Sequence, residues 1–241
     1  MQNLRPNVDR GKKAITLIWI VFATEILALI LGFVQYQMLS QAHEGLKAPE
    51  SRTAFYSAFE SIVGVLSMIA YIGSAILFIM WFRRAYFNLH QRVPHLSKSE
   101  GWAAGSWFVP IINLYYPYQI MKELYQDTYA LLIKNGVENV KNPGLKYVNW
   151  WWALWLMSIL MSVIIFRLEF LLNTYEDLMN TVVLTIANVF LSLVTAILAV
   201  RVVADYMPLD KLLHEIDTDT EDPSDHILSE KKISKNIFLL S

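Results

Sequence analysis

Residues 102–117 read Trp-Ala-Ala-Gly-Ser-Trp-Phe-Val-Pro-Ile-Ile-Asn-Leu-Tyr-Tyr-Pro, an almost wholly apolar stretch. A helix needs about 20 apolar residues to cross a bilayer, and shorter runs more often re-enter the membrane or lie in its interface. Gly105, Pro110 and Asn113 interrupt the stretch where a plain span would carry Leu or Val. We therefore expect a re-entrant or interfacial element, extending over residues 98–134, around which longer spans are arranged.

Four longer apolar runs flank this element, two on each side, and each is long enough to cross a bilayer. Their expected bounds are residues 14–39, 54–82, 147–172 and 181–204. Only 17% of the 241 residues are charged, against about 25% in soluble domains. We expect an all-α integral membrane protein whose four spans form a bundle. The expected parts are a basic arm (1–13), a membrane domain (14–205) and a charged, flexible tail (206–241).

The Lys and Arg residues predict the orientation, because cytosolic loops carry an excess of them. If both termini are cytosolic, 17 of the 20 Lys and Arg residues fall in cytosolic segments. Only Lys47, Arg52 and Arg167 fall outside. The element at 98–134 is then expected to approach the membrane from the cytosol.

Within this element the sequence predicts a helix, a turn and a second helix. Ser97–Glu100 has the spacing of a capping box that would open the first helix, and Pro110 should end or kink it. Pro117 suits the first turn of the second helix, which should end near Lys134. We expect Asn113, in the turn, to satisfy backbone groups that the prolines leave free.

Polar and small residues recur every three or four positions along each predicted span, which is the spacing of helix contacts in membrane bundles. Glu25 is the most unusual of them. A rise of 1.5 Å per residue from Ala14 places it about 16 Å deep, near the bilayer midplane. Side chains of the other three spans reach a similar level. The candidate intramembrane polar site is therefore Glu25, Tyr71, Ser158, Asn188 and Ser192.

Glu25 has two interpretations. A charged carboxylate is costly at this depth, so the side chain should face the bundle and be protonated or hydrogen-bonded. It could serve as a proton or cation site, or as a neutral hydrogen-bond clamp between helices. The clamp is favoured because Arg167 and Arg201 lie near the ends of their predicted spans, which leaves no Lys, Arg or His within the membrane as a relay partner. Glu60 and Arg167, near the outer ends of their spans, could form a structural ion pair.

No catalytic motif is present. The absence of cysteine excludes disulfides, thiolate metal sites and cysteine nucleophiles. The five histidines form no zinc or haem motif, and no P-loop, nucleophile elbow or dinucleotide-binding glycine pattern occurs. A net charge of −1 gives no case for a nucleic-acid partner. We therefore expect no cofactor or metal, lean away from an enzyme, and expect the lipid bilayer as partner.

Two motifs resemble a known family. Residues 81–88, Trp-Phe-Arg-Arg-Ala-Tyr-Phe-Asn, form an arginine-rich helix end, and residues 107–117 fit a Trp-Phe-x-Pro-x-x-Asn-Leu-x-x-Pro signature. The chain resembles, from Trp81 to about Tyr125, the bacterial family catalogued as domain of unknown function 4328. The resemblance implies a location in the bacterial plasma membrane and carries no established activity. Its signature residues are Arg83, Arg84, Asn88, Trp107, Pro110, Asn113 and Pro117.

Three functions stay open. A non-catalytic scaffold or partner subunit, acting with another membrane protein or as a homo-oligomer, is favoured by the missing catalytic motifs and the small-residue seams. The alternative is a small transporter or channel-like protein, in which Glu25 binds a proton or cation and the broken stretch lines a cavity. A weaker alternative is a protein that handles lipid headgroups at the cytosolic face.

Overall fold

The computed structural model describes residues 4–46, 49–138, 140–171 and 174–216, and the regular structure in these ranges is entirely helical. The elements, in order, are α1 (Val8–His43), α2 (Glu50–His90), α3 (Trp102–Gly105), the 3-10 turn η1 (Ile112–Leu114), α4 (Tyr116–Lys134), α5 (Lys146–Glu169) and α6 (Tyr175–Glu215). Four of them, α1, α2, α5 and α6, are long and apolar enough to cross a membrane. The predicted all-helical class with four such helices is therefore confirmed.

The helix ends follow from local chemistry. α6 begins at a capping box, in which Thr174 Oγ1 accepts the Asp177 N–H and the Asp177 carboxylate accepts the Thr174 N–H, each at 3.1 Å. α4 carries Pro117 in its first turn, as predicted, because proline needs no amide partner there. The same helix ends at Lys134, and Gly136, two residues beyond, has a positive φ of 70° that suits glycine.

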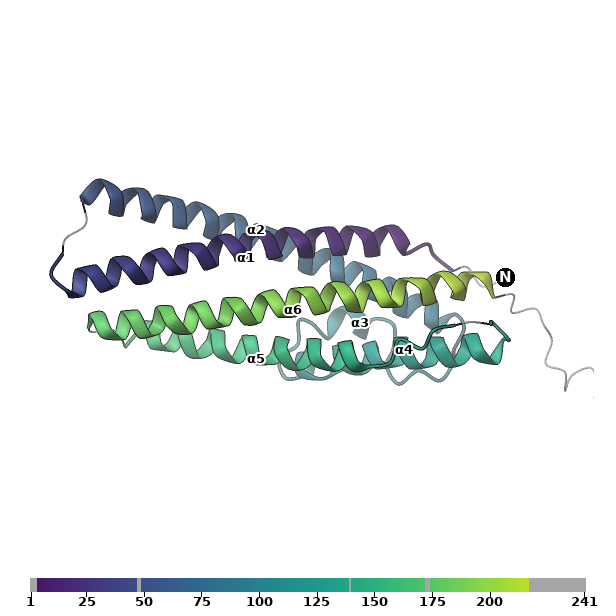
Figure 1. Ribbon diagram of the computed structural model, residues 1–241. Helices are drawn as coiled ribbons and strands as arrows, with labels where there is room; N and C mark the ends of the chain where they lie inside the picture. The colour runs from purple at the N-terminus through teal and green to yellow at the C-terminus, as the bar shows by residue number, and fades with distance from the viewer. Residues whose placement is uncertain (1–3, 47–48, 139, 172–173, 217–241) are drawn as a thin grey trace, which may run out of the picture.

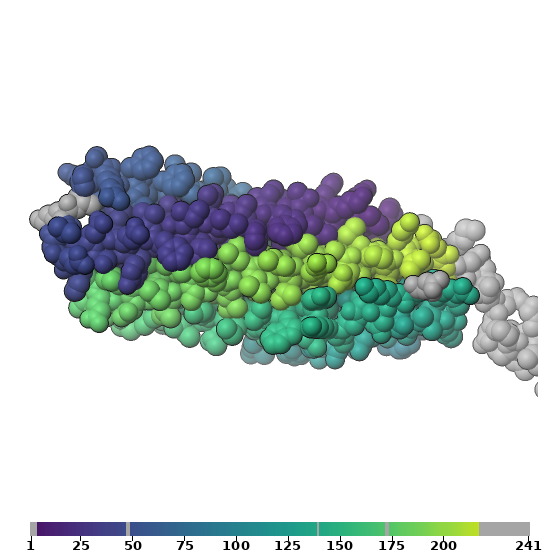
Figure 2. All heavy atoms as spheres, in the orientation of Figure 1, coloured from purple at the N-terminus to yellow at the C-terminus, as the bar shows by residue number. Residues whose placement is uncertain are grey.

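The four long helices lie side by side in the order α2, α1, α6, α5 (Figure 1). α1 packs along both α2 and α6, and α5 packs along α6. Figure 2 shows the face on which the side chains of α1 and α6 meet. α2 and α5 are the two outer helices of this layer. They approach each other where Phe78 of α2 meets Trp151 of α5, with ring centroids 5.6 Å apart.

Glycines allow α1 to approach its neighbours closely. A Cβ atom on Gly11 would lie 2.9 Å from Sδ of Met207, and one on Gly32 would lie 3.0 Å from Cγ1 of Ile186, both on α6. A larger side chain at either position would require the Met207 or Ile186 side chain to move. Such small residues are what membrane helices use where their backbones come close.

Most of the buried side chains in the described part of the chain lie where residues 4–7, the end of α2, α3, α4 and the last turns of α6 meet, which we call the packed end (Figure 1). Trp81, Tyr86, Leu124 and Tyr206 are fully buried there. Elsewhere the long helices expose many large apolar side chains. A helix that is apolar on all sides is expected in lipid or in a large core, so this exposure fits helices that contact lipid.

Three expectations need correction. The tail does not begin at 206, because α6 continues to Glu215 and buries Leu209 and Leu213 against the packed end; residues 217–241 lie outside the described residues. Ser97 caps no helix; its hydroxyl donates to the Glu123 carboxylate. Glu60 accepts a hydrogen bond from Tyr56, and among the described residues no ion pair joins Glu60 to Arg167.

Candidate functional site

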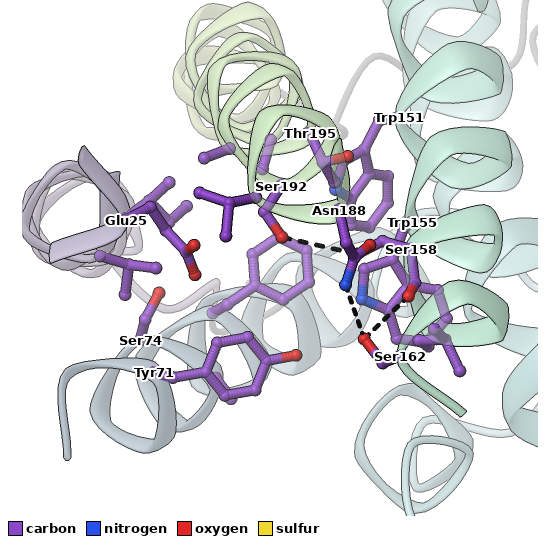
Figure 3. A pocket seen from close by; sticks show the side chains of 18 of the residues that line it. Glu25, Tyr71, Ser74, Trp151, Trp155, Ser158, Ser162, Asn188, Ser192 and Thr195 are labelled. Atoms are coloured by element: carbon purple, nitrogen blue, oxygen red, sulfur yellow. Dashed lines mark hydrogen bonds between the residues drawn. The ribbon is translucent and has the colours of Figure 1, made fainter. Parts of the chain in front are cut away.

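A cavity of about 630 Å³ lies between α1, α2, α5 and α6. Its wall contains all five residues of the candidate polar site, which the structure therefore brings together (Figure 3). One comes from α1, one from α2, one from α5 and two from α6: Glu25, Tyr71, Ser158, Asn188 and Ser192. The regular spacing of polar residues on each span thus marks one common interior surface.

Aromatic side chains form most of the wall toward the packed end. Trp107 lies between Phe78 of α2 and Trp155 of α5, with ring centroids 5.7 Å and 5.8 Å away. Trp151 of α5 completes this group. Edge-to-face arrangements at these distances are favourable, so the aromatic group gives the cavity a rigid closed end.

The polar side of the cavity is a hydrogen-bonded seam between α5 and α6. Ser158 Oγ donates to Asn188 Oδ1 at 3.1 Å, and Asn188 Nδ2 donates to Ser162 Oγ at 2.9 Å. Ser162 in turn donates to the backbone oxygen of Ser158 at 2.9 Å. The oxygen and the nitrogen of the Asn188 amide thus both form hydrogen bonds within the protein. Its main role is to hold α5 against α6.

Glu25 differs from these residues, because its carboxylate points into the cavity (Figure 3) and has no hydrogen-bond or ion-pair partner in the described part of the chain. The expected clamp between helices is therefore wrong. The lining residues include no Lys, Arg or His, and Tyr71 is the other titratable side chain among them. The cavity consequently combines apolar walls, a satisfied amide seam and one unpaired acid.

The cavity opens between the two outer helices. Tyr71 of α2 and Phe166 of α5 line it and are nevertheless 57% and 58% exposed. Ser162 of α5 also lines it and is exposed. A molecule could therefore enter sideways between α2 and α5, on the side where a bilayer would surround the helices.

Residues 107–117, which we call the signature segment, reach this cavity through a single side chain, Trp107. A tight turn follows it, in which Ile111 has a positive φ of 68° and the Ile112 N–H donates to the Pro110 oxygen at 2.8 Å. The Trp152 indole N–H then donates to the Leu114 oxygen at 3.2 Å and ties the turn to α5. This geometry holds Trp107 in the gap between α2 and α5.

The family model described as domain of unknown function (DUF4328) matches residues 45–207, which is more than half of the chain. The chain belongs to this family. No curated protein and no solved structure matches it. The match covers α2 to α5 and most of α6, together with the signature segment. α1, which carries Glu25, precedes the matched residues. Three of the four long helices that line the cavity, α2, α5 and α6, thus belong to the matched region. Glu25 is contributed by α1, which lies outside it.

The other DUF4328 signature residues lie away from the cavity. Arg83 pairs with Glu100 at 3.4 Å on the surface, and Arg84 is partly buried beside it. Pro117 begins α4. Asn113 does not serve the freed backbone groups as expected, because its buried Oδ1 has no hydrogen-bond partner. These residues belong to the region around the packed end, and none of them lines the cavity.

Asn88, the remaining signature residue, is fully buried in a polar cluster that was not predicted. Its amide accepts the Arg5 N–H at 3.0 Å and donates to the Arg5 oxygen at 2.9 Å. It also contacts Asp210 and His214 of α6, at 3.4 Å and 3.3 Å. The cluster docks the N-terminal segment of this DUF4328 chain onto α2 and α6.

A signal for this cluster was present in the sequence. Val202, Tyr206, Leu209 and Leu213 continue the apolar spacing of the fourth span at steps of four, three and four residues, and all four are buried. That spacing indicates a helix with a packed face. It could have placed Asp210 inside the fold instead of in a solvated tail.

Proposed function

We propose that this chain is a multi-pass membrane protein that binds a small, membrane-soluble molecule in the cavity between its long helices. The cavity carries this proposal. Its volume of about 630 Å³ falls in the range of about 300–1,000 Å³ that small-molecule sites occupy. Its wall is largely apolar and aromatic with a few polar groups, which is also typical of such sites.

The lateral opening between α2 and α5 suggests the route of entry. Tyr71 and Phe166 frame it, and both would contact acyl chains if the helices span a bilayer. A ligand already dissolved in the membrane could enter without crossing a polar surface. This favours a lipophilic or amphipathic ligand over a water-soluble one.

The cavity supports the transport class more than the scaffold class. A protein that only holds a partner is served by a tightly packed seam, whereas binding and release of a ligand require space. The lipid-headgroup alternative has less support, because Arg83 and Arg84 do not line the cavity. The proposed activity is therefore non-catalytic binding, with movement of the ligand as its natural extension.

The membrane setting is part of the proposal. We place the chain in a bacterial plasma membrane with both termini in the cytosol, on the strength of the Lys and Arg count. Residues 98–134 would then form the re-entrant or interfacial element. Phe108 and Ile111, which are 76% and 74% exposed at its turn, support this placement because lipid is the environment that such apolar tips require.

The absence of native cysteine allows a direct test of this orientation. Ser99→Cys and Glu44→Cys place single thiols at exposed positions at opposite ends of the long helices, since Glu44 follows the end of α1 and Ser99 follows the end of the antiparallel α2. In intact bacterial cells, a membrane-impermeant maleimide should label Glu44→Cys, and Ser99→Cys only after permeabilisation. The reverse pattern would overturn the proposed orientation.

Ligand binding is tested with diphenylhexatriene and its cationic trimethylammonium and anionic propionate derivatives. The full chain in lipid nanodiscs should show saturable energy transfer to at least one probe, because Trp107, Trp151 and Trp155 lie in the cavity wall. Ala196→Trp, which fills the cavity, should abolish the saturable component. The control Ala187→Trp, at an exposed position on α6 outside the lining, should retain it. No saturable transfer to any probe would refute the proposal.

A further inference from the structure

We infer that the ligand of this cavity carries a positive charge, and that Glu25 recognises it as a lipophilic amine or other organic cation. This inference rests on the proposed function, since it names the chemical class of the molecule that the cavity takes. The observation behind it is the contrast between Glu25 and the hydroxyl and amide groups of the α5–α6 seam, Ser158, Ser162 and Asn188. The α5–α6 seam is satisfied within the protein, whereas the Glu25 carboxylate has no partner there.

The charge balance of the cavity favours a cation. An ionised carboxylate that leaves water without a partner is destabilised, and a bound opposite charge offsets that cost. A neutral ligand would leave the acid unpaired, and an anionic one would add repulsion. Of the three charge classes, a cation is the only one whose binding the acid improves.

Within residues 4–46, 49–138, 140–171 and 174–216, no basic side chain lines the cavity to take this role. The nearest ones along α1 and α2 are Lys13 and Arg83, each 12 residues from the level of Glu25 and Tyr71, which is about 18 Å along a helix axis. On α5 and α6 the nearest are Arg167 and Arg201, both exposed. Toward Glu25, α2 contributes Tyr71 as its titratable lining residue, and α5, α6 and the signature segment contribute none.

The aromatic wall has the complementary chemistry. The faces of Trp, Tyr and Phe rings attract cations, most strongly when water is excluded. Trp107, Trp151, Trp155, Phe78 and Tyr71 all line the cavity. An alkyl- or aryl-ammonium ion could therefore place its charge beside Glu25 and its apolar groups against these rings. The carboxylate and the rings would together replace the water that surrounds such an ion in solution.

A consequence is competition with protons. Since a proton and the organic cation would bind the same carboxylate, protonation of Glu25 should release the cation. The pH dependence of cation binding in the wild type therefore reports on Glu25 independently of any substitution.

The test compares the three diphenylhexatriene probes, which share one fluorophore and differ in charge. The wild-type chain in nanodiscs should bind the trimethylammonium derivative at least tenfold more tightly than the uncharged parent, and the propionate least. Glu25→Gln should reduce the affinity for the cationic probe about tenfold or more and leave the parent probe unchanged. The control Glu44→Gln removes a carboxylate from an exposed position just after α1 and should behave as the wild type.

The outcomes separate this inference from the proposed function. Saturable binding of the uncharged probe with no preference for the cation, or equal cation affinity in wild type and Glu25→Gln, overturns the inference and leaves the cavity a ligand site. Absence of saturable binding for all three probes refutes both. If Glu25→Gln does not fold, the wild-type titration decides: cation binding that weakens on acidification while the uncharged probe is unaffected supports the inference, and parallel behaviour of the two probes overturns it.

Discussion

The indole of Trp107 meets the indole of Trp155 edge to face, with 5.8 Å between the ring centroids. Trp107 belongs to the signature segment and Trp155 to α5, and both line the cavity. A stretch too short to span a bilayer therefore builds the closed end of the space between the long helices. The segment joins the packed end to the candidate site.

Trp107→Ala should destabilise the fold. The side chain packs against Phe78, Phe82, Trp152 and Trp155, and truncation of a large aromatic residue in a packed site costs about 3–5 kcal/mol. We expect a loss near the lower end, about 3 kcal/mol, because Trp107 is only partly buried. Thermal unfolding followed by circular dichroism in detergent measures it.

The neighbouring residue supplies the control. Phe108 is 76% exposed, so Phe108→Ala should change stability by less than about 0.5 kcal/mol, as surface substitutions usually do. Equal losses in the two variants would show that Trp107 does not support the aromatic group.

Gly11→Ala should weaken the contact between α1 and α6. The added methyl group would lie 2.9 Å from Met207 Sδ and 3.2 Å from Trp81 Nε1, and overpacking of this kind costs about 1–3 kcal/mol. The higher helix propensity of alanine returns at most about 1 kcal/mol. A net loss of about 1 kcal/mol in the free energy of unfolding is therefore expected, measurable as a lower melting temperature.

Gly64→Ala is the matched variant, because nothing lies within 4 Å of a Cβ atom built there. Only the propensity effect remains, so this variant should be as stable as the wild type or more stable. A loss at Gly64 equal to that at Gly11 would contradict the close approach of α1 and α6.

Asn88→Ala should release the N-terminal segment. Its amide bonds to both backbone groups of Arg5 and donates to the buried Asp210 carboxylate at 3.4 Å, and a buried polar group left without a partner costs about 1–3 kcal/mol. We expect a loss of about 2 kcal/mol and faster hydrogen exchange at residues 5–11. Asn180→Ala, at an exposed position on α6, should change neither the free energy of unfolding nor the exchange at residues 5–11. Unaltered exchange in Asn88→Ala would show that the segment is held by other contacts.

Much of this architecture can be predicted from the sequence, because two simple quantities determine it. Apolar run length identifies the four long helices, and the period of polar residues identifies the side of each that faces its neighbours. Glu25, Tyr71 and Asn188 were placed in one site on these grounds, and they line one cavity. Pro117 marks the start of α4 because its missing amide is harmless only in a first turn.

The remaining features depend on contacts that a single sequence does not encode locally. An apolar run does not specify its neighbours, so the order α2, α1, α6, α5 and the opening between α2 and α5 could not be predicted. Trp107 enters the cavity because of a turn at Ile111, where a β-branched residue adopts a positive φ that its type disfavours. The burial of Asp210 depends on Asn88, which lies more than a hundred residues earlier in the chain.

The last prediction concerns Asp127 on α4, which lies beside the Glu123 carboxylate that accepts the Tyr86 hydroxyl at 2.6 Å. Burial raises the pKa of the Asp127 carboxyl above its ordinary value of 3.8, and the charge of Glu123 raises it further, against the opposing effect of His95. The folded state therefore binds this proton more tightly than the unfolded chain. Binding of this proton stabilises the folded state. The stabilisation is fully present below pH 3.8, the ordinary pKa of the group, and is lost as the pH rises through the raised pKa.

Asp127→Asn removes this titration, so the variant should be more stable than the wild type at neutral pH, and the difference should shrink as the pH falls toward the unfolded-state pKa. Melting temperatures of both proteins across that range measure the effect. Glu138→Gln, an exposed acid just beyond α4, controls for the loss of one negative charge. If Asp127→Asn were instead less stable than the wild type at neutral pH, and gained stability relative to it on acidification, the folded protein would favour the ionised form of Asp127 and the prediction would be wrong.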